Sequence, residues 1–217
     1  MEKITPFREL SGRDKAQYIF DYYKFHILGG ILLLIAIISV IYTIATHVDP
    51  TLSVVMINAD GKDTEPFETF LADKGCEVVN GSVDFPDVLK FDENGNTQGS
   101  YYDDMILSVY VGGGDYDLFF GTGNKFKAYA DEGCLMDLRL VLSEETFASI
   151  PEEDLLWCTP EGAITDDGTG TWPCAVLLTG NSFVEHFYGD TPVYYGVLYN
   201  RPHPELANEF SEYLLQQ

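Results

Sequence analysis

Positive charge is scarce in this chain. Its 217 residues include twelve Lys or Arg against thirty-five Asp or Glu, a net charge of −23. Proteins that bind nucleic acid gain most of their affinity by neutralising phosphates with basic residues. This composition therefore excludes nucleic acid as a partner. With 46% hydrophobic and 14% aromatic residues, the chain has too many apolar side chains to be disordered.

Motifs of the common catalytic and metal sites are also missing. The sequence has no HExxH, no GxSxG and no CxxC, the usual signatures of zinc hydrolases, serine hydrolases and thiol or zinc sites. His186 and His203, the only histidines after residue 48, stand apart from any such motif. We therefore expect no enzyme activity, no cofactor and no metal site. Because carboxylates are abundant, a membrane-tethered hydrolase with a pair of acids stays open as an alternative.

One long stretch lacks charge altogether. Residues 25–48, FHILGGILLLIAIISVIYTIATHV, contain no Asp, Glu, Lys or Arg. Twenty residues of helix measure about 30 Å, the thickness of the hydrocarbon core of a bilayer. A cleaved signal peptide has a shorter apolar region and an Ala-x-Ala-like cleavage site, and this run is longer and lacks that site. We therefore predict an uncleaved signal-anchor that contacts the lipid bilayer through residues 25–48 and continues a helix starting near Ser11.

This run divides the chain into three parts. Residues 1–24 form a cytoplasmic tail with a juxtamembrane helix, residues 25–48 span the membrane, and residues 49–217 form an extracytoplasmic domain. Five basic residues precede the run, and basic flanks stay in the cytoplasm. After the run, seven basic residues stand against thirty-one acidic ones, which gives this part a net charge of −24. We predict a single-pass protein of the cell membrane with its N-terminus in the cytoplasm.

After the run the pattern is α/β. The sequence LSVVMIN at residues 52–58 is almost continuously apolar, which is typical of a strand covered on both faces, and we expect it to be the central strand. A helix capped by Thr64, with Pro66 in its first turn, and a second strand around residues 77–83 would complete a strand–helix–strand unit. Later strands are expected at residues 117–121, 172–178 and 193–199.

Helices are expected between these strands and after the last one. Ser100 and Asp103 have the spacing of a capping box, and the helix that follows them carries an apolar face. The residues of this face are Tyr102, Met105, Ile106 and Val109. Further helices are expected after Thr122, Ser143, Pro151 and Pro204. The sequence thus predicts one compact three-layer α/β domain.

Two stretches resemble type II periplasmic solute-binding proteins. Residues 115–138, DYDLFFGTGNKFKAYADEGCLMDL, are similar to a strand, a small-residue turn and a helix of that family. Residues 193–215, VYYGVLYNRPHPELANEFSEYLL, are similar to its strand with a Tyr-Gly step and a helix that opens on Pro-Glu-Leu-Ala. The resemblance implies a binding-protein-like fold. Family members have two lobes around a cleft, and only about fifty residues are available for a second lobe between residues 138 and 191. We therefore expect that lobe to be reduced or missing.

A candidate ligand site lies where predicted strands end. The turn at residues 121–124 joins a strand to a helix N-terminus, where free backbone N–H groups can hold an anion or a polar ligand. In open α/β sheets, ligands bind outside the carboxyl ends of the strands. The candidate ligand-binding residues are Asn58, Asp60, Gly121, Thr122, Gly123 and Asn124. A purely structural turn is the other interpretation.

The cysteines suggest a disulfide. Cys76, Cys134, Cys158 and Cys174 all follow the apolar run, and an even number of cysteines in an oxidising compartment permits disulfides. Cys158 and Cys174 flank a predicted hairpin whose turn is at residues 166–170, so we predict that these two pair. Cys76 and Cys134 follow predicted helix ends, where a small buried thiol fits equally well.

A polar loop starts like a calcium site. Asp92, Asn94 and Asn96 match the first positions of an EF-hand loop, but Thr97 replaces the required glycine and Asp103 replaces the final glutamate. This departure favours a solvated loop.

Recognition is the function that these features favour. One lobe would leave a small solute exposed, whereas small-molecule sites bury most of the ligand. The domain is also rich in tyrosine, a residue that anchors protein interfaces. We expect a membrane-anchored recognition domain that binds a membrane or envelope protein. The alternatives are a tethered solute-binding protein for a small solute, the hydrolase named above, and a structural envelope subunit.

Overall fold

The computed structural model describes residues 11–46, 49–159 and 170–217. The chain divides into two compact units, Met1–Val48 and Asp49–Gln217. The first contains helix α1 (Gly12–Thr46), which begins beside Ser11 as predicted. Its segment Tyr23–Ala45 is 23 residues of helix, long and apolar enough to cross a membrane.

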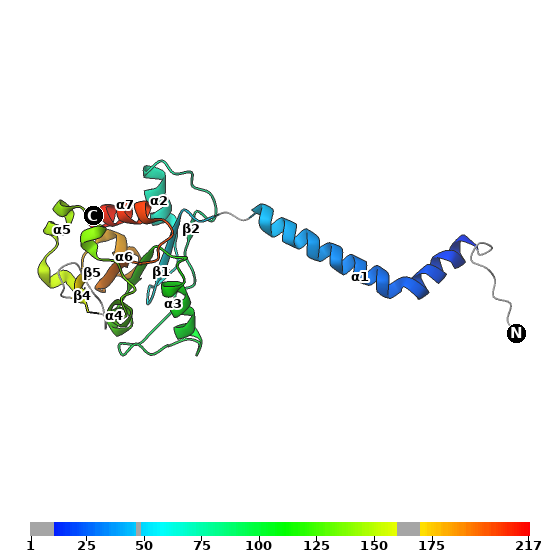
Figure 1. Ribbon diagram of the computed structural model, residues 1–217, viewed down its shortest axis with the longest axis horizontal. Helices are drawn as coiled ribbons and strands as arrows, with labels where there is room; N and C mark the ends of the chain where they lie inside the picture. Colours follow the sequence, from blue (N-terminus) through cyan, green and yellow to red (C-terminus); the bar gives the residue numbers. More distant parts are fainter. Residues whose placement is uncertain (1–10, 47–48, 160–169) are drawn as a thin grey trace. The chain divides into compact units, whose positions relative to one another are not determined.

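The second unit is a mixed α/β domain built on one six-stranded sheet (Figure 1). The strand order is β2-β1-β3-β6-β5-β4. Strand β1 pairs in parallel with β2 and β3, whereas β6 is antiparallel to β3 and β5, and β4 is antiparallel to β5. The strands are β1 (Leu52–Met56), β2 (Val83–Asp84), β3 (Leu118–Gly121), β4 (Leu155–Cys158), β5 (Trp172–Leu178) and β6 (Val193–Val197). The predicted α/β class is confirmed.

Helices cover both faces of this sheet, so the domain has three layers (Figure 1). One face packs against α2, α6 and α7 around Phe67, whose ring centre lies 5.0 Å from that of Phe183 and 5.5 Å from that of Phe210. The other face packs against α3 and α4. The helices are α2 (Glu65–Asp73), α3 (Asp103–Gly112), α4 (Gly123–Asp131), η2 (Leu138–Leu140), α5 (Glu144–Ser149), η3 (Glu152–Asp154), α6 (Ser182–Tyr188) and α7 (Pro204–Leu214).

Two strand predictions need correction. All five residues of β1 are buried, as expected of a strand covered on both faces, but β3 and β6 occupy the centre of the sheet, and β1 lies next to its β2 edge. The strand expected around residues 77–83 shrinks to the two residues of β2. Its place is taken by a turn in which Val79 N–H donates to Ser82 Oγ at 2.8 Å and Ser82 N–H donates to Val79 O at 2.9 Å.

Helix α6 was not predicted. Asn181 caps α6 by accepting hydrogen bonds from the N–H groups of Phe183 and Val184 at 3.1 and 3.3 Å. Asparagine is among the best N-cap residues, so the signal was present in the sequence. The stretch was too short to show a clear helical period.

The described residues form a single lobe. Between η2 and β6, the described segments contribute β4 and β5 to the same sheet, and they build no second sheet. The antiparallel pairing of β4 with β5 confirms the expected hairpin, although its predicted turn at residues 166–170 lies outside the described residues except for Gly170. The domain therefore presents no second wall to a ligand within its described part.

Cys158 and Cys174, the predicted disulfide pair, are free thiols on neighbouring strands, and Cys76 and Cys134 are free as well. Each thiol of the pair points toward a carbonyl of the other strand. Cys158 Sγ lies 3.6 Å from Trp172 O, and Cys174 Sγ lies 3.4 Å from Leu156 O. The contact with Cys158, together with burial, raises the pKa of the Cys174 thiol. The disulfide stays a prediction.

Candidate functional site

A crevice lies at the carboxyl ends of β1 and β3, where the sequence places the candidate ligand site. Strands β1 and β3 are parallel neighbours, and the helices that follow them, α2 and α4, pack on opposite faces of the sheet. Ligands of open α/β sheets bind outside the carboxyl ends of strands at such a switch point. Asn58 follows β1 and Thr122 follows β3, so the two predicted segments meet there.

Asn58 holds this crevice together. Its Nδ2 donates to Thr122 Oγ1 at 2.9 Å, and its Oδ1 accepts from Phe91 N–H at 2.7 Å. Its backbone has φ of 66°, the only positive φ at a non-glycine among the described residues. Lys90 Nζ donates to the carbonyls of Asn58 and Ala59 at 3.1 and 2.6 Å. The polar atoms of the Asn58 side chain are therefore already engaged by the protein.

A hollow of about 430 Å³ lies beside Asn58. Three of the predicted ligand residues, Asn58, Thr122 and Gly123, line it, together with Phe91, Asp92, Glu93, Gln98, Thr191 and Pro192. The other three, Asp60, Gly121 and Asn124, are not among its lining residues.

Each of those three residues has a different setting. The Asp60 side chain is 80% exposed and lies 3.8 Å from Lys90 Nζ. Gly121 is buried, and a Cβ there would overlap Ile57, so this glycine serves close packing. Asn124 is exposed on the first turn of α4. The structure thus brings half of the predicted site together at the hollow.

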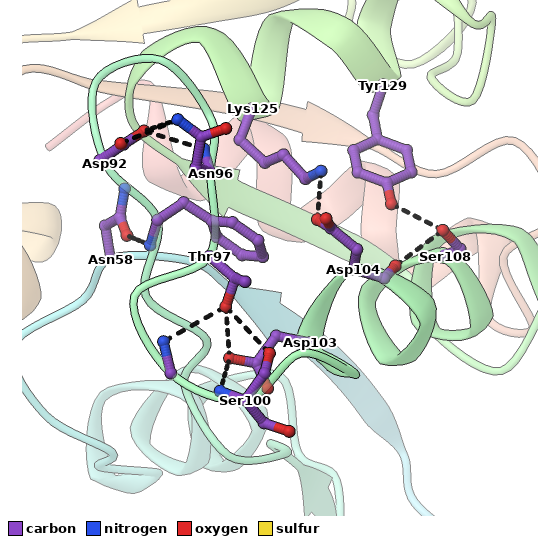
Figure 2. Close-up of polar contacts among 12 residues, drawn as sticks. Asn58, Asp92, Asn96, Thr97, Ser100, Asp103, Asp104, Ser108, Lys125 and Tyr129 are labelled. Atoms are coloured by element: carbon purple, nitrogen blue, oxygen red, sulfur yellow. Dashed lines mark hydrogen bonds and ion pairs between the residues drawn. The ribbon is translucent and has the colours of Figure 1, made fainter.

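The loop beside the hollow organises itself through its own carboxylates (Figure 2). Asp92 accepts hydrogen bonds from the N–H groups of Asn94 and Asn96 at 2.9 and 2.8 Å, and from Asn96 Nδ2 at 3.0 Å. The side-chain bond from Asn96, followed by these backbone bonds, lowers the pKa of Asp92. The carboxylate of Asp92 is therefore committed to the loop rather than to a ligand.

Asp103 holds the other end of the same loop. Its Oδ2 accepts from Ser100 N–H and from Thr97 Oγ1, each at 2.9 Å, which is half of the expected capping box (Figure 2). Asp92 and Asp103 thus fix separate turns. In the described part of the chain, no three His, Cys, Asp or Glu side chains gather closely enough to hold a metal ion, and the arrangement gives the calcium interpretation no support.

The apolar face predicted for α3 is exposed rather than buried. Leu107 and Val111 face the core, whereas Tyr102, Met105 and Val109 are 59, 61 and 59% exposed, and the preceding Tyr101 is 89% exposed. Ile106 lies between the two sides and is partly buried. We call the surface formed by Tyr101, Tyr102, Met105 and Val109 the α3 face.

Contacts with α4 fix the rotation of α3 (Figure 2). Ser108 Oγ donates to Asp104 O at 2.8 Å and lies 2.9 Å from Tyr129 Oη, and Asp104 pairs with Lys125. Sequence reasoning missed this orientation because α3 is apolar on two sides. A second apolar side is itself a signal that a helix has more than one partner.

A buried carboxylate lies at the opposite end of β1 and β3. Asp117 is fully buried and accepts from Ser53 N–H, His203 N–H and His203 Nδ1 at 2.9, 2.7 and 2.9 Å. Ser, His and Asp are also the residue types of a hydrolase triad, which needs a serine–histidine hydrogen bond. Ser53 Oγ is buried without a hydrogen-bond partner among the described residues. The cluster ties β1, β3 and α7 together and does not form a nucleophile.

Comparison of the chain with protein-family models, curated proteins and solved structures finds no match. The interpretation of the α3 face and the hollow rests on their geometry.

Proposed function

We propose that this chain is a membrane-anchored recognition domain. Helix α1 holds it in the membrane, with the N-terminus in the cytoplasm, and the domain that starts at residue 49 binds a membrane or envelope protein outside the cell. The contact surface in this proposal is the α3 face, with the fold serving as a binding-protein-like scaffold of one lobe.

The exposure of the α3 face carries this proposal. Single exposed apolar residues are common on protein surfaces, but a contiguous group of large ones marks an interaction site. Tyr102, Met105 and Val109 are spaced by three and four residues, so they line one side of the helix. Tyrosine and methionine are also enriched in protein interfaces. Such a helix side fits an apolar groove on a partner.

The hollow gives weaker support to a solute-binding function. Asn58 and Asp92 have their side-chain polar atoms engaged by the protein, and the described domain has one lobe. Small-molecule sites bury 70–90% of the ligand's surface, which one wall cannot do.

Substitution of the α3 face tests the proposal. Met105→Asp in the full chain places a charge on the face without touching the core, and Leu140→Asp is the matched control, since Leu140 is 69% exposed on η2. Partners are recovered by chemical cross-linking in cells. We expect the Met105→Asp variant to lose an envelope partner that the Leu140→Asp variant keeps. Equal recovery by both variants, or equal loss, contradicts the α3 face as the contact surface.

A tethered solute-binding protein is the second candidate, favoured by the hollow at the switch point of the sheet. Glu93 and Gln98 line it with exposed side chains. A thermal-shift screen of the full chain in detergent with amino acids, sugars, peptides and oxyanions tests this function. A rise of several degrees with one solute, lost in Gln98→Ala, supports solute binding. We expect no such rise.

A further inference from the structure

Carboxylates flank helix α3 and follow its C-terminal end. Asp104 lies on the α4 side of α3, where it pairs with Lys125. On the other side, Tyr110 of α3 packs edge-on against Tyr116, with ring centres 5.2 Å apart. Burial, and then the charges of Asp87 and Asp84, raise the pKa of Tyr110. Asp115 follows the C-terminal end of α3, beside Gly113. We call Asp84, Asp87, Asp104 and Asp115 the acidic rim.

Two lysines pair with carboxylates of this rim. Lys125 is paired with Asp104, its ammonium lies 5.1 Å from the centre of the Phe91 ring, and only 17% of its side chain is exposed. Lys62 Nζ lies 3.8 Å from Asp87 Oδ1. Two lysines against four aspartates leave the rim negative, within a domain whose net charge is −24.

We infer that the partner of the α3 face is a protein with an apolar groove bordered by Lys or Arg. This inference rests on the proposed function and adds the chemistry of the partner. The groove follows from the shape of the face, because a helix side with anchors at residues 102, 105 and 109 inserts into a concave surface. The basic border follows from the rim, because interfaces pair surfaces of opposite charge.

The same charges disfavour the other possible occupants. In a symmetric contact between two copies, each surface meets its own counterpart, so the rim carboxylates of one copy would face those of the other. A bilayer surface rich in anionic lipid carries negative potential and would repel the rim as well. A basic protein surface is the occupant that gains electrostatic energy at this site.

A photo-cross-linking residue, p-benzoylphenylalanine, tests the inference when it replaces Met105 in the full chain in cell membranes. The control position is Leu140. The yield of the protein adduct is compared at 50 and 300 mM NaCl, and again after Asp87→Asn with Asp115→Asn. Both of these aspartates are exposed. Glu152→Gln with Glu153→Gln is the matched charge control, because both glutamates are exposed on η3 beside the distant strand β4.

We expect a protein adduct at residue 105 and none at residue 140, with the partner's cross-linked peptide lying between Lys or Arg residues. Its yield falls several-fold at the higher salt concentration and by a similar factor in the Asp87, Asp115 variant, while the Glu152, Glu153 variant matches the parent. If the yield of the protein adduct changes neither with salt nor in the Asp87, Asp115 variant, the basic border is wrong and the proposed function still stands. An adduct with a second copy, an adduct with lipid, or none at residue 105 overturns both.

Discussion

Asn58 Nδ2 donates a hydrogen bond of 2.9 Å to Thr122 Oγ1, although the two residues are 64 positions apart in the sequence. The bond joins the carboxyl ends of β1 and β3, and the other side of the same amide accepts from Phe91 N–H. One short side chain thus connects two strands and the start of the loop beside the hollow. Its main role in this structure is to hold the crevice in shape.

Substitution of Asn58 should therefore act on stability. Asn58→Ala removes both hydrogen bonds and puts alanine, which tolerates the left-handed conformation less well than asparagine, at φ of 66°. Together these changes should lower the free energy of unfolding by about 2–4 kcal/mol. Asn58→Gly loses the same bonds but tolerates that φ, so it should be about 1 kcal/mol more stable than the alanine variant. Urea denaturation measures both values. Equal stability of the two variants would show that the positive φ imposes no constraint.

The effects of substitutions at Gly121 and Ile57 on the free energy of unfolding should be strongly coupled. A Cβ at Gly121 would overlap Ile57 Cγ1 and lie 2.8 Å from its Cδ1, so Gly121→Ala should destabilise the domain by about 1–3 kcal/mol. Ile57→Ala removes both atoms and should cost about 2–5 kcal/mol alone. The double variant should be more stable than the sum of the two effects predicts, by about 1 kcal/mol or more.

Gly112→Ala is the control for that cycle, because nothing lies within 4 Å of a Cβ at Gly112. It should leave the free energy of unfolding unchanged or raise it by up to about 1 kcal/mol, because Gly112 lies in α3 and alanine favours helix. Simple additivity of Gly121→Ala and Ile57→Ala in urea denaturation would contradict the packing argument.

Glu212 links stability to pH. Burial alone would raise its pKa, but hydrogen bonds from the Thr146 hydroxyl and from Ser143 outweigh burial and lower it below its ordinary value of 4.5. Because the pKa is lower in the folded state, the stability that the carboxylate contributes is present above pH 4.5 and is lost as the pH falls through the folded value.

Glu212→Gln should therefore be less stable than the parent at pH 7, by about 1 kcal/mol, since the carboxylate caps the N-terminus of α5. The difference should shrink progressively below pH 4.5. Thermal unfolding followed by circular dichroism from pH 7 to pH 3 measures it. A difference that stays constant over this range would mean that the charge of Glu212 is not what stabilises α5.

We propose that the basic residues before the apolar run hold the N-terminus in the cytoplasm. We expect protease added to intact spheroplasts to digest the domain that starts at residue 49 and to leave α1 protected. An epitope tag after Gln217, detected with an antibody, reports the digestion of the domain. Protection of that tag until the cells are lysed would place the domain in the cytoplasm. A secreted fragment that begins near residue 47 would show that the apolar run is a cleaved signal peptide.

Local features of the sequence predicted much of the fold. An uncharged run of 24 residues can only be helical if it is to satisfy its backbone groups in lipid, and α1 covers residues 25–46 of that run. Residues 52–56 are apolar without a break, and the strand there is buried on both faces. Gly75 and Gly133, which follow α2 and α4, have φ of 76° and 78°, a conformation that glycine adopts at little cost.

Only half of the candidate site could be predicted, because only local features can be read from the sequence. A strand end followed by a helix N-terminus can be recognised locally, and this placed Asn58, Thr122 and Gly123 at the hollow. The distance between chain segments is not a local property. Asp60 lies near Lys90 because Lys90 bonds to the carbonyls of Asn58 and Ala59 just after β1. Asp92 accepts its hydrogen bonds within its own loop.

The sequence by itself determined the long apolar helix, the α/β class and most element boundaries, because each depends on the pattern of neighbouring residues or on the backbone freedom of one residue. Only the tertiary structure decided the strand order and which side of α3 is buried. Helix α3 offers two apolar sides, and the choice between them depends on the fit of Leu107 and Val111 to the sheet and on the hydrogen bond between Ser108 and Tyr129 of α4. Packing between distant segments left Tyr102, Met105 and Val109 outside.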